Sequence, residues 1–194
     1  MQLKRIFTTE GAKGTKNYLN TQKKYEILRT VLYFSISLSL FIAGYIQTGE
    51  KANLLSIVAV LGCLPASKSM VGAVMFLRFK SCGETTAAAI EEHSEGLSCL
   101  YDMVFTSYKK NFVVSHMAVS GNTICGFAEN PEFDENAFRL HIDNILKLDG
   151  HKDIVVKIFT DLPKYLQRLE QMRGTAEPSD RVSALIATLK SVVL

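Results

Sequence analysis

The sequence predicts a membrane protein in which a two-helix transmembrane hairpin precedes a small cytosolic α/β domain. Residues 30–49 are twenty consecutive uncharged residues, and a second apolar stretch, 52–77, follows after only Glu50 and Lys51. Residues 84–194 carry instead the shorter helical and alternating patterns of one folded domain with one core. The hydrophobicity of the chain is thus concentrated near its beginning.

The two apolar stretches have the length of membrane-spanning helices. Twenty helical residues at about 1.5 Å each cover the roughly 30 Å of a hydrocarbon core. The connection between the stretches is long enough only to reverse the chain, so we expect antiparallel helices at about 28–48 and 52–74 within a hairpin unit, 27–80. A second apolar run directly after the first is atypical of a cleaved secretory signal.

Positive charges flank the hairpin on one side. Arg78 and Lys80 follow the second helix, and only Lys51 lies in the loop. The positive-inside rule therefore predicts an integral protein of the cell membrane with both termini cytoplasmic. The region 1–26 is polar and is predicted to form a basic arm whose charges attract anionic headgroups. The seven basic residues before the first span are Lys4, Arg5, Lys13, Lys16, Lys23, Lys24 and Arg29.

Two residues interrupt the second span. Lys68 lies about 24 Å along the helix from Ala52, near the cytoplasmic edge of the hydrocarbon, where its long stem reaches the headgroups. This depth favours an anchor, with a functional charge in a transport path as the alternative. Pro65 lacks an amide hydrogen and predicts a kink. Arg78 and Lys80 are expected to anchor the end of the same helix.

Small residues recur at four-residue spacing on both predicted spans, and such faces allow helices to approach closely. We expect them to pack within the hairpin or between copies of the chain. The predicted packing residues are Ser35, Ser39 and Ala43 on the first span, and Gly62 and Ala66 on the second.

The domain pattern predicts the order αβββαβαα with a mostly antiparallel sheet and one crossover, and an α+β domain of unrelated topology is the alternative. Asp134 suits a helix N-cap with Phe133 and Phe138 as a hydrophobic staple. The nearly all-apolar strand 154–160 is expected at the centre of the sheet. The predicted elements are a helix at 85–101, strands at 103–107, 111–119 and 123–128, a helix at 134–150, the strand at 154–160, and helices at 163–174 and 178–193.

This element order resembles the core of the restriction-endonuclease-like fold and of nuclease-related domains. The resemblance covers about 85–160 and rests on element order. In that family an acidic residue near the second strand and an acidic-x-Lys motif on the third hold a divalent metal at the phosphate. The matching stretch, 113–128, contains no carboxylate and no lysine. The resemblance therefore implies the fold without the metal centre.

Other residues with catalytic potential lack catalytic spacing. The cysteines form no CxxC pair, and the histidines form no HExxH or HxH motif. His116 lies between apolar neighbours of a strand, which favours a core histidine over a general base. The polar segment 149–153 is an ordinary loop or a contact surface. These residues are Cys63, Cys82, Cys99 and Cys125, and His93, His116, His141 and His151.

The sequence favours a non-catalytic module that is tethered to the lipid bilayer and presents its cytosolic domain to a protein partner or to another copy. One alternative is a divergent nuclease-like enzyme at the membrane. Another is an oligomeric channel or transporter component that uses Lys68. No pattern indicates a metal, a cofactor, a nucleic acid or a small-molecule substrate.

Overall fold

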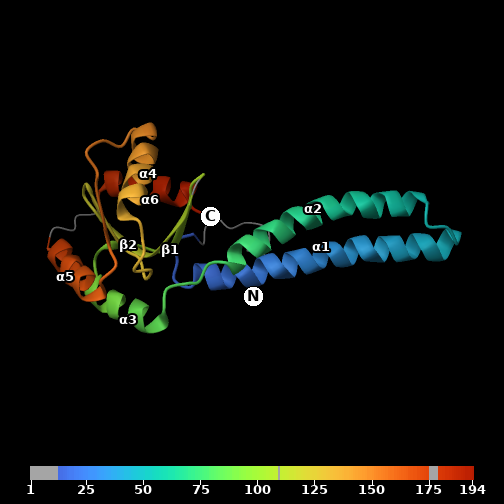
Figure 1. Cartoon of the computed structure of the whole chain (residues 1–194), viewed down its shortest axis with the longest axis horizontal. Helices are drawn as coiled ribbons and strands as arrows, with labels where there is room; N and C mark the ends of the chain where they lie inside the picture. Colours follow the sequence, from blue (N-terminus) through green and yellow to red (C-terminus); the bar gives the residue numbers. More distant parts are fainter. Residues whose placement is uncertain (1–12, 109, 175–178) are drawn as a thin grey trace. The chain divides into compact units, whose positions relative to one another are not determined.

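The computed structural model describes residues 13–108, 110–174 and 179–194, and the chain divides into two compact units. Within the described residues, one unit is Leu19–Lys80, and the other joins residues 13–18 to Ser81–Leu194. Figure 1 shows that the first unit contains the two long helices and the second the sheet with its covering helices. Residues 1–12 of the predicted basic arm lie outside the described residues.

The first unit is a helical hairpin of α1 (Tyr18–Thr48) and α2 (Leu54–Leu77), both long and apolar enough to span a membrane. α1 begins well before the predicted residue 28, because the polar stretch ahead of the apolar run is rich in helix-forming lysine and glutamine. Asn53 caps α2 by accepting a hydrogen bond from the Ser56 amide at 2.8 Å.

The second unit is a mixed four-stranded sheet with helices on both faces. The strand order is β1-β2-β3-β4, in which the first two pairings are antiparallel and β3 pairs with β4 in parallel. Its elements are α3 (Glu84–His93), β1 (Ser98–Thr106), β2 (Asn111–Ser120), β3 (Thr123–Phe127), α4 (Glu135–Leu148), β4 (Val155–Phe159), α5 (Leu162–Arg173) and α6 (Asp180–Val192).

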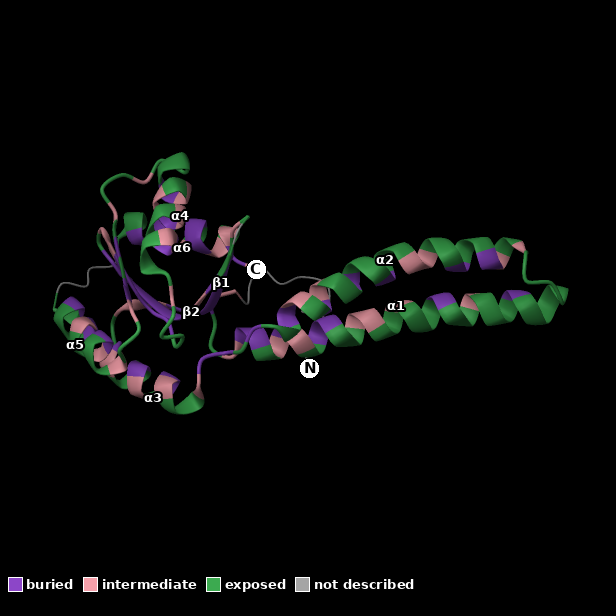
Figure 2. Cartoon of the chain, in the orientation of Figure 1, coloured by how far each residue is buried: buried purple, intermediate pink, exposed green. Residues whose placement is uncertain are grey.

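Each face of the sheet has its own hydrophobic core. α4 and α6 cover one face, where Phe138, Ile142 and Leu185 are buried against the strands. α3 and α5 cover the other, where Ile90 and Tyr165 are fully buried. Figure 2 shows β1 and β2 mostly buried and the covering helices buried along one side. The domain is therefore a three-layer α/β sandwich.

The predicted start of α4 is confirmed. Asp134 accepts a hydrogen bond from the Ala137 amide at 3.0 Å, which makes it the N-cap of α4. The Phe133 and Phe138 rings pack with centroids 5.4 Å apart, as a hydrophobic staple requires. Pro178, the predicted start of the last helix, lies outside the described residues, and α6 is capped by Ser179.

Two predictions about the domain are wrong. The helix predicted over 85–101 ends at His93, because Gly96 takes a left-handed conformation and the residues that follow pair with β2. Asp102, which precedes the strand predicted at 103–107, therefore lies inside β1 and is buried. The strand predicted to be central, β4, lies at the edge of the sheet, where Val155 and Lys157 are exposed and Val156 and Ile158 are buried.

β1 and β2 change face part-way along their length. Leu100 and Met103 of β1 both pack into the core under α4 and α6, although a regular strand would send them to opposite faces. Asp102, at φ 55°, provides the change of direction. Val114 and Met117 of β2 repeat this spacing. Tyr101 and its partner in register, His116, are thereby turned to the face that α3 and α5 cover.

Candidate functional site

The hairpin helices meet along one constant register. A Cβ atom added to Gly44 would lie 2.8 Å from the Leu55 Cβ, and one added to Gly62 would lie 2.6 Å from the Ser37 hydroxyl oxygen. Closer to the start of α1 and the end of α2, the Thr30 and Ser69 hydroxyl oxygens are 3.0 Å apart. The helices therefore approach closely at these three points along the hairpin, two of which are occupied by glycine.

Side chains in the hairpin are distributed inversely to those of a water-soluble protein. The residues buried on α2 are small or polar for most of its length, including Ser56, Ala59, Ala66 and Ser69. The large apolar side chains point outward, and Ile46, Leu54 and Leu64 are 75, 78 and 69 % exposed. Figure 2 shows exposed residues along the outside of both helices. The apolar surface of the hairpin therefore faces its surroundings.

The predicted packing residues divide between two sides of the hairpin. Gly62 and Ala66 lie in the contact between the helices, and Ala66 is completely buried. Ser35, Ser39 and Ala43 are exposed on α1, away from that contact. Ser39 donates to the Ser35 carbonyl at 2.8 Å, so its hydroxyl is satisfied within its own helix. Packing of this face between copies stays a prediction.

The other predicted residues of the hairpin are on its exterior. Lys68, Arg78 and Lys80 are exposed. Pro65 is also exposed, and α2 runs through it as one helix that is bowed in Figure 1. These positions fit an anchoring role for Lys68, because its side chain lies outside the contact between the helices.

Sequence reasoning missed a buried polar cluster at the start of α1. One carboxylate oxygen of Glu26 accepts hydrogen bonds from the Gln22 amide at 3.1 Å and from the Arg29 guanidinium. The other carboxylate oxygen lies 3.3 Å from where a Cβ of Gly72 would be. The spacing of Glu26 and Arg29, three residues apart before an apolar run, was the available signal.

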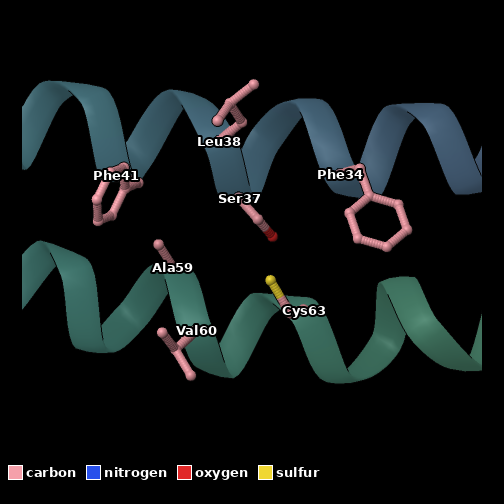
Figure 3. A pocket seen from close by; sticks show the side chains of 7 residues that line it. All are labelled: Phe34, Ser37, Leu38, Phe41, Ala59, Val60 and Cys63. Atoms are coloured by element: carbon pink, nitrogen blue, oxygen red, sulfur yellow. The ribbon is translucent and has the colours of Figure 1, made fainter.

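A groove opens between the two helices near the middle of the hairpin. Its volume is about 210 Å³, and Phe34 and Phe41 of α1 flank it (Figure 3). Figure 3 shows the Ser37 hydroxyl and the Cys63 thiol pointing toward one another across the gap. The lining is otherwise apolar, so the groove suits hydrocarbon and lacks the convergent polar groups of a reaction site.

The domain contains a buried histidine, as predicted for His116. Its Nδ1 lies 2.6 Å from the Tyr165 hydroxyl, and the ring packs edge-on against Tyr101 with centroids 4.5 Å apart. Burial lowers the pKa of His116 from 6.5 to about 3, so the imidazole is neutral at physiological pH. Its Nε2 is buried and makes no hydrogen bond within the described residues.

The domain cysteines are protonated thiols. Burial, with help from the Glu129 carboxylate, raises the pKa of Cys82 to about 12. Burial likewise raises the pKa of Cys99 to about 11, and it raises that of Cys125. Thiolates are the nucleophiles and metal ligands of cysteine chemistry. These side chains therefore act as small apolar residues in the core between the sheet and α3 and α5.

The polar loop 149–153, which connects α4 to β4, is hydrogen-bonded to α6. The Thr188 hydroxyl donates to the Asp149 carboxylate and lies 3.0 Å from His151 Nε2. A catalytic triad would need the carboxylate on the other ring nitrogen, whereas Asp149 approaches Nε2 itself at 3.6 Å. No group of three or more metal-ligating side chains occurs among the described residues. These hydrogen bonds therefore attach the loop that follows α4 to α6.

Two of the basic residues before the hairpin belong to the domain. Lys13 donates to the Val193 carbonyl at 2.6 Å, and Lys16 pairs with Glu91 at 2.9 Å. Between them, the carbonyl of Gly14 accepts a hydrogen bond from the Tyr101 amide of β1 at 2.9 Å. In the segment that follows the hairpin in the sequence, the Cys82 amide donates a hydrogen bond to the Asp102 carboxylate at 2.8 Å. Both connections to the hairpin are thus fastened to neighbouring residues of β1.

No protein family model, no curated protein and no solved structure matches this chain. The geometry of the two units therefore carries the functional argument alone.

Replacement of Gly62 by valine is expected to force the helices of the hairpin apart. The added Cβ would lie 2.6 Å from the Ser37 oxygen, closer than side-chain atoms approach one another. Leu61→Val changes an exposed neighbour and is the matched control. We expect thermal unfolding of the helices in detergent micelles, followed by far-UV circular dichroism, to shift down by several degrees for Gly62→Val only. Equal melting of both variants would contradict the close contact.

Acidification is expected to destabilise the domain through His116. Below about pH 6.5 the unfolded state binds a proton on this residue, whereas the folded state does not until about pH 3. The contribution of the neutral His116 to the free energy of unfolding is therefore fully present above pH 6.5. It falls by about 1.4 kcal/mol per pH unit between pH 6.5 and about pH 3. His116→Phe should reduce the slope of urea-unfolding free energy against pH, and His141→Gln should keep it. Equal slopes in wild type and His116→Phe would contradict a buried neutral imidazole.

Proposed function

We propose that the hairpin inserts into a membrane and that the α/β domain is a tethered module that binds a protein partner or another copy of the chain. The inverse distribution of side chains in the hairpin carries this proposal. A water-soluble helical pair buries its large apolar residues between the helices, whereas this hairpin buries serine, alanine and glycine there and exposes Ile46, Leu54 and Leu64.

The energetic consequence favours lipid around the hairpin. Covering an exposed leucine or isoleucine side chain with an apolar medium is worth about 1.5–3 kcal/mol. Many such side chains are exposed on both helices, from Ile27 to Ile46 on α1 and from Leu54 to Leu77 on α2. Soluble monomers rarely expose apolar patches larger than a few hundred Å². The seam of small residues is also the contact that membrane helices use.

The distribution of charge supports a cytoplasmic position for both ends of the hairpin. The helices are antiparallel, so Lys23 and Lys24 of α1 lie at the same end as Arg78 and Lys80 after α2. The opposite end carries Glu50 and Lys51, whose charges cancel. Positively charged loops remain on the cytoplasmic side. The domain, which follows Lys80, would then be cytosolic.

The domain offers contact surface of the kind that protein interfaces use. Tyr108 is fully exposed at the turn between β1 and β2, and Leu140 and Leu148 are exposed on α4. Tyrosine is enriched in interfaces. These residues project from a sandwich in which Cys82, Cys125 and His116 are buried and neutral. We therefore assign the domain to binding, with the hairpin holding it at the membrane surface.

Cysteine labelling of the full chain in intact cells tests this proposal. In a Cys63→Ser background, Glu50→Cys places a thiol in the hairpin loop, and Tyr108→Cys places one on the domain. A membrane-impermeant maleimide should label Glu50→Cys in intact cells and Tyr108→Cys only after lysis, and the chain should resist alkaline carbonate extraction. Release by carbonate, or equal labelling of both positions in intact cells, would overturn the proposal.

A further inference from the structure

We infer that the base of the hairpin, the end formed by the first turns of α1 and the last turns of α2, binds the phosphate groups of anionic phospholipids. This inference rests on the proposed insertion of the hairpin into a membrane, and it adds the class of lipid and the residues that select it. The basic residues form an inner tier, Arg29 and Lys68, and an outer tier, Lys23, Lys24, Arg78 and Lys80.

The register of the hairpin fixes the two tiers. The hydrogen-bonded hydroxyls of Thr30 and Ser69 are 3.0 Å apart, and each directly follows an inner-tier residue in the sequence, so Arg29 and Lys68 lie at one level. Along α1 the outer tier begins about 7.5 Å nearer the base, and along α2 it begins about 15 Å nearer, at helical rise per residue. The basic residues therefore extend from the level of Arg29 and Lys68 through a distance that includes a headgroup layer.

Most of the charge of the base is not neutralised by the hairpin itself. Among the ion pairs of the described residues, Glu26 pairs with Arg29, and no carboxylate pairs with Lys23, Lys24, Lys68, Arg78 or Lys80. Some exposed cations elsewhere are paired, as in Lys16 with Glu91 and Arg173 with Glu95, whereas Lys147 and Lys152 have no ion pair within the described part of the chain. The five cations of the base that lack an ion pair among the described residues are therefore available to anions from outside the hairpin.

The depth of the inner tier identifies those anions as lipid phosphates. Lys68 lies beside the apolar helices, and from there its long side chain reaches the headgroup layer by extending toward the base. Arg29 lies at the same level, with its guanidinium held by the Glu26 carboxylate. The outer tier approaches the same layer from the aqueous side. Each lysine or arginine near an anionic surface strengthens attraction about fivefold. The balanced Glu50 and Lys51 at the other end make the preference specific to one leaflet.

Lipid retention by the purified full chain tests the inference. The protein is reconstituted in vesicles of three parts phosphatidylcholine to one part phosphatidylglycerol, extracted in mild detergent, and the retained lipids are counted by native mass spectrometry. Wild type should retain phosphatidylglycerol at several times its share of the vesicle. Lys68→Gln should lower that enrichment toward the vesicle share, and Lys24→Gln with Arg78→Gln should lower it further. Lys51→Gln, which removes a lysine at the far end, should leave it unchanged.

Several outcomes would overturn the inference. Retention of both lipids in the vesicle ratio by a carbonate-resistant chain would refute the lipid preference and leave the membrane anchor standing. Equal loss in Lys51→Gln and Lys68→Gln would refute the assigned site. Displacement of phosphatidylglycerol by 10 mM inorganic phosphate would assign the base to a soluble phosphate ligand. A chain that alkaline carbonate releases from the vesicles would refute the proposed function and this inference together.

Discussion

The close contact between α1 and α2 is the constraint on which the hairpin depends. Gly44 and Gly62 leave room for the facing helix, and a methyl group at either position would overlap its atoms. Because small and polar side chains occupy this seam, the leucine, isoleucine and valine residues of both helices have only the exterior left to them. The same contact fixes the register, and the register in turn brings the basic residues of both helices to one end.

The domain is organised around β1 in a comparable way. The Tyr101 amide of this strand donates a hydrogen bond to the Gly14 carbonyl, and the neighbouring Asp102 carboxylate accepts one from the Cys82 amide. Val104 further along accepts a hydrogen bond from the Leu194 amide. The segments that lead into α1 and out of α2 are thus fastened to one strand of the sandwich. Asp102, in a left-handed conformation, also turns Tyr101 toward His116 and Tyr165.

Much of this fold follows from sequence pattern, and the exceptions have physical causes. The lengths of the apolar helices, the meander of three strands and the cap at Asp134 depend on local periodicity and capping, which a sequence displays directly. The edge position of β4 depends on which strand it pairs with, and its apolar composition carries no such information. Leu97 and Leu100 have helical spacing, but pairing of β1 with β2 overrides it.

The candidate sites divide in the same way. A core role for His116 was predictable because its neighbours in the strand are apolar. The side of α1 that meets α2 was not, because Ser35 and Ser37 are equally small and only the register separates an exposed serine from a buried one. Glu26 was missed for a related reason, since a charge before an apolar run is ordinary until the facing helix encloses it.

The central claim is that the apolar exterior of the hairpin faces lipid, and spin-label accessibility in vesicles tests it most directly. Labels would replace Ile36, Leu64 and, on the domain, Tyr108, each as the single reactive cysteine in a Cys63→Ser background. We predict that oxygen relaxes the labels at Ile36 and Leu64 far more than a water-soluble nickel complex does, with the reverse at Tyr108. Nickel accessibility at Ile36 and Leu64 equal to that at Tyr108 would contradict the account.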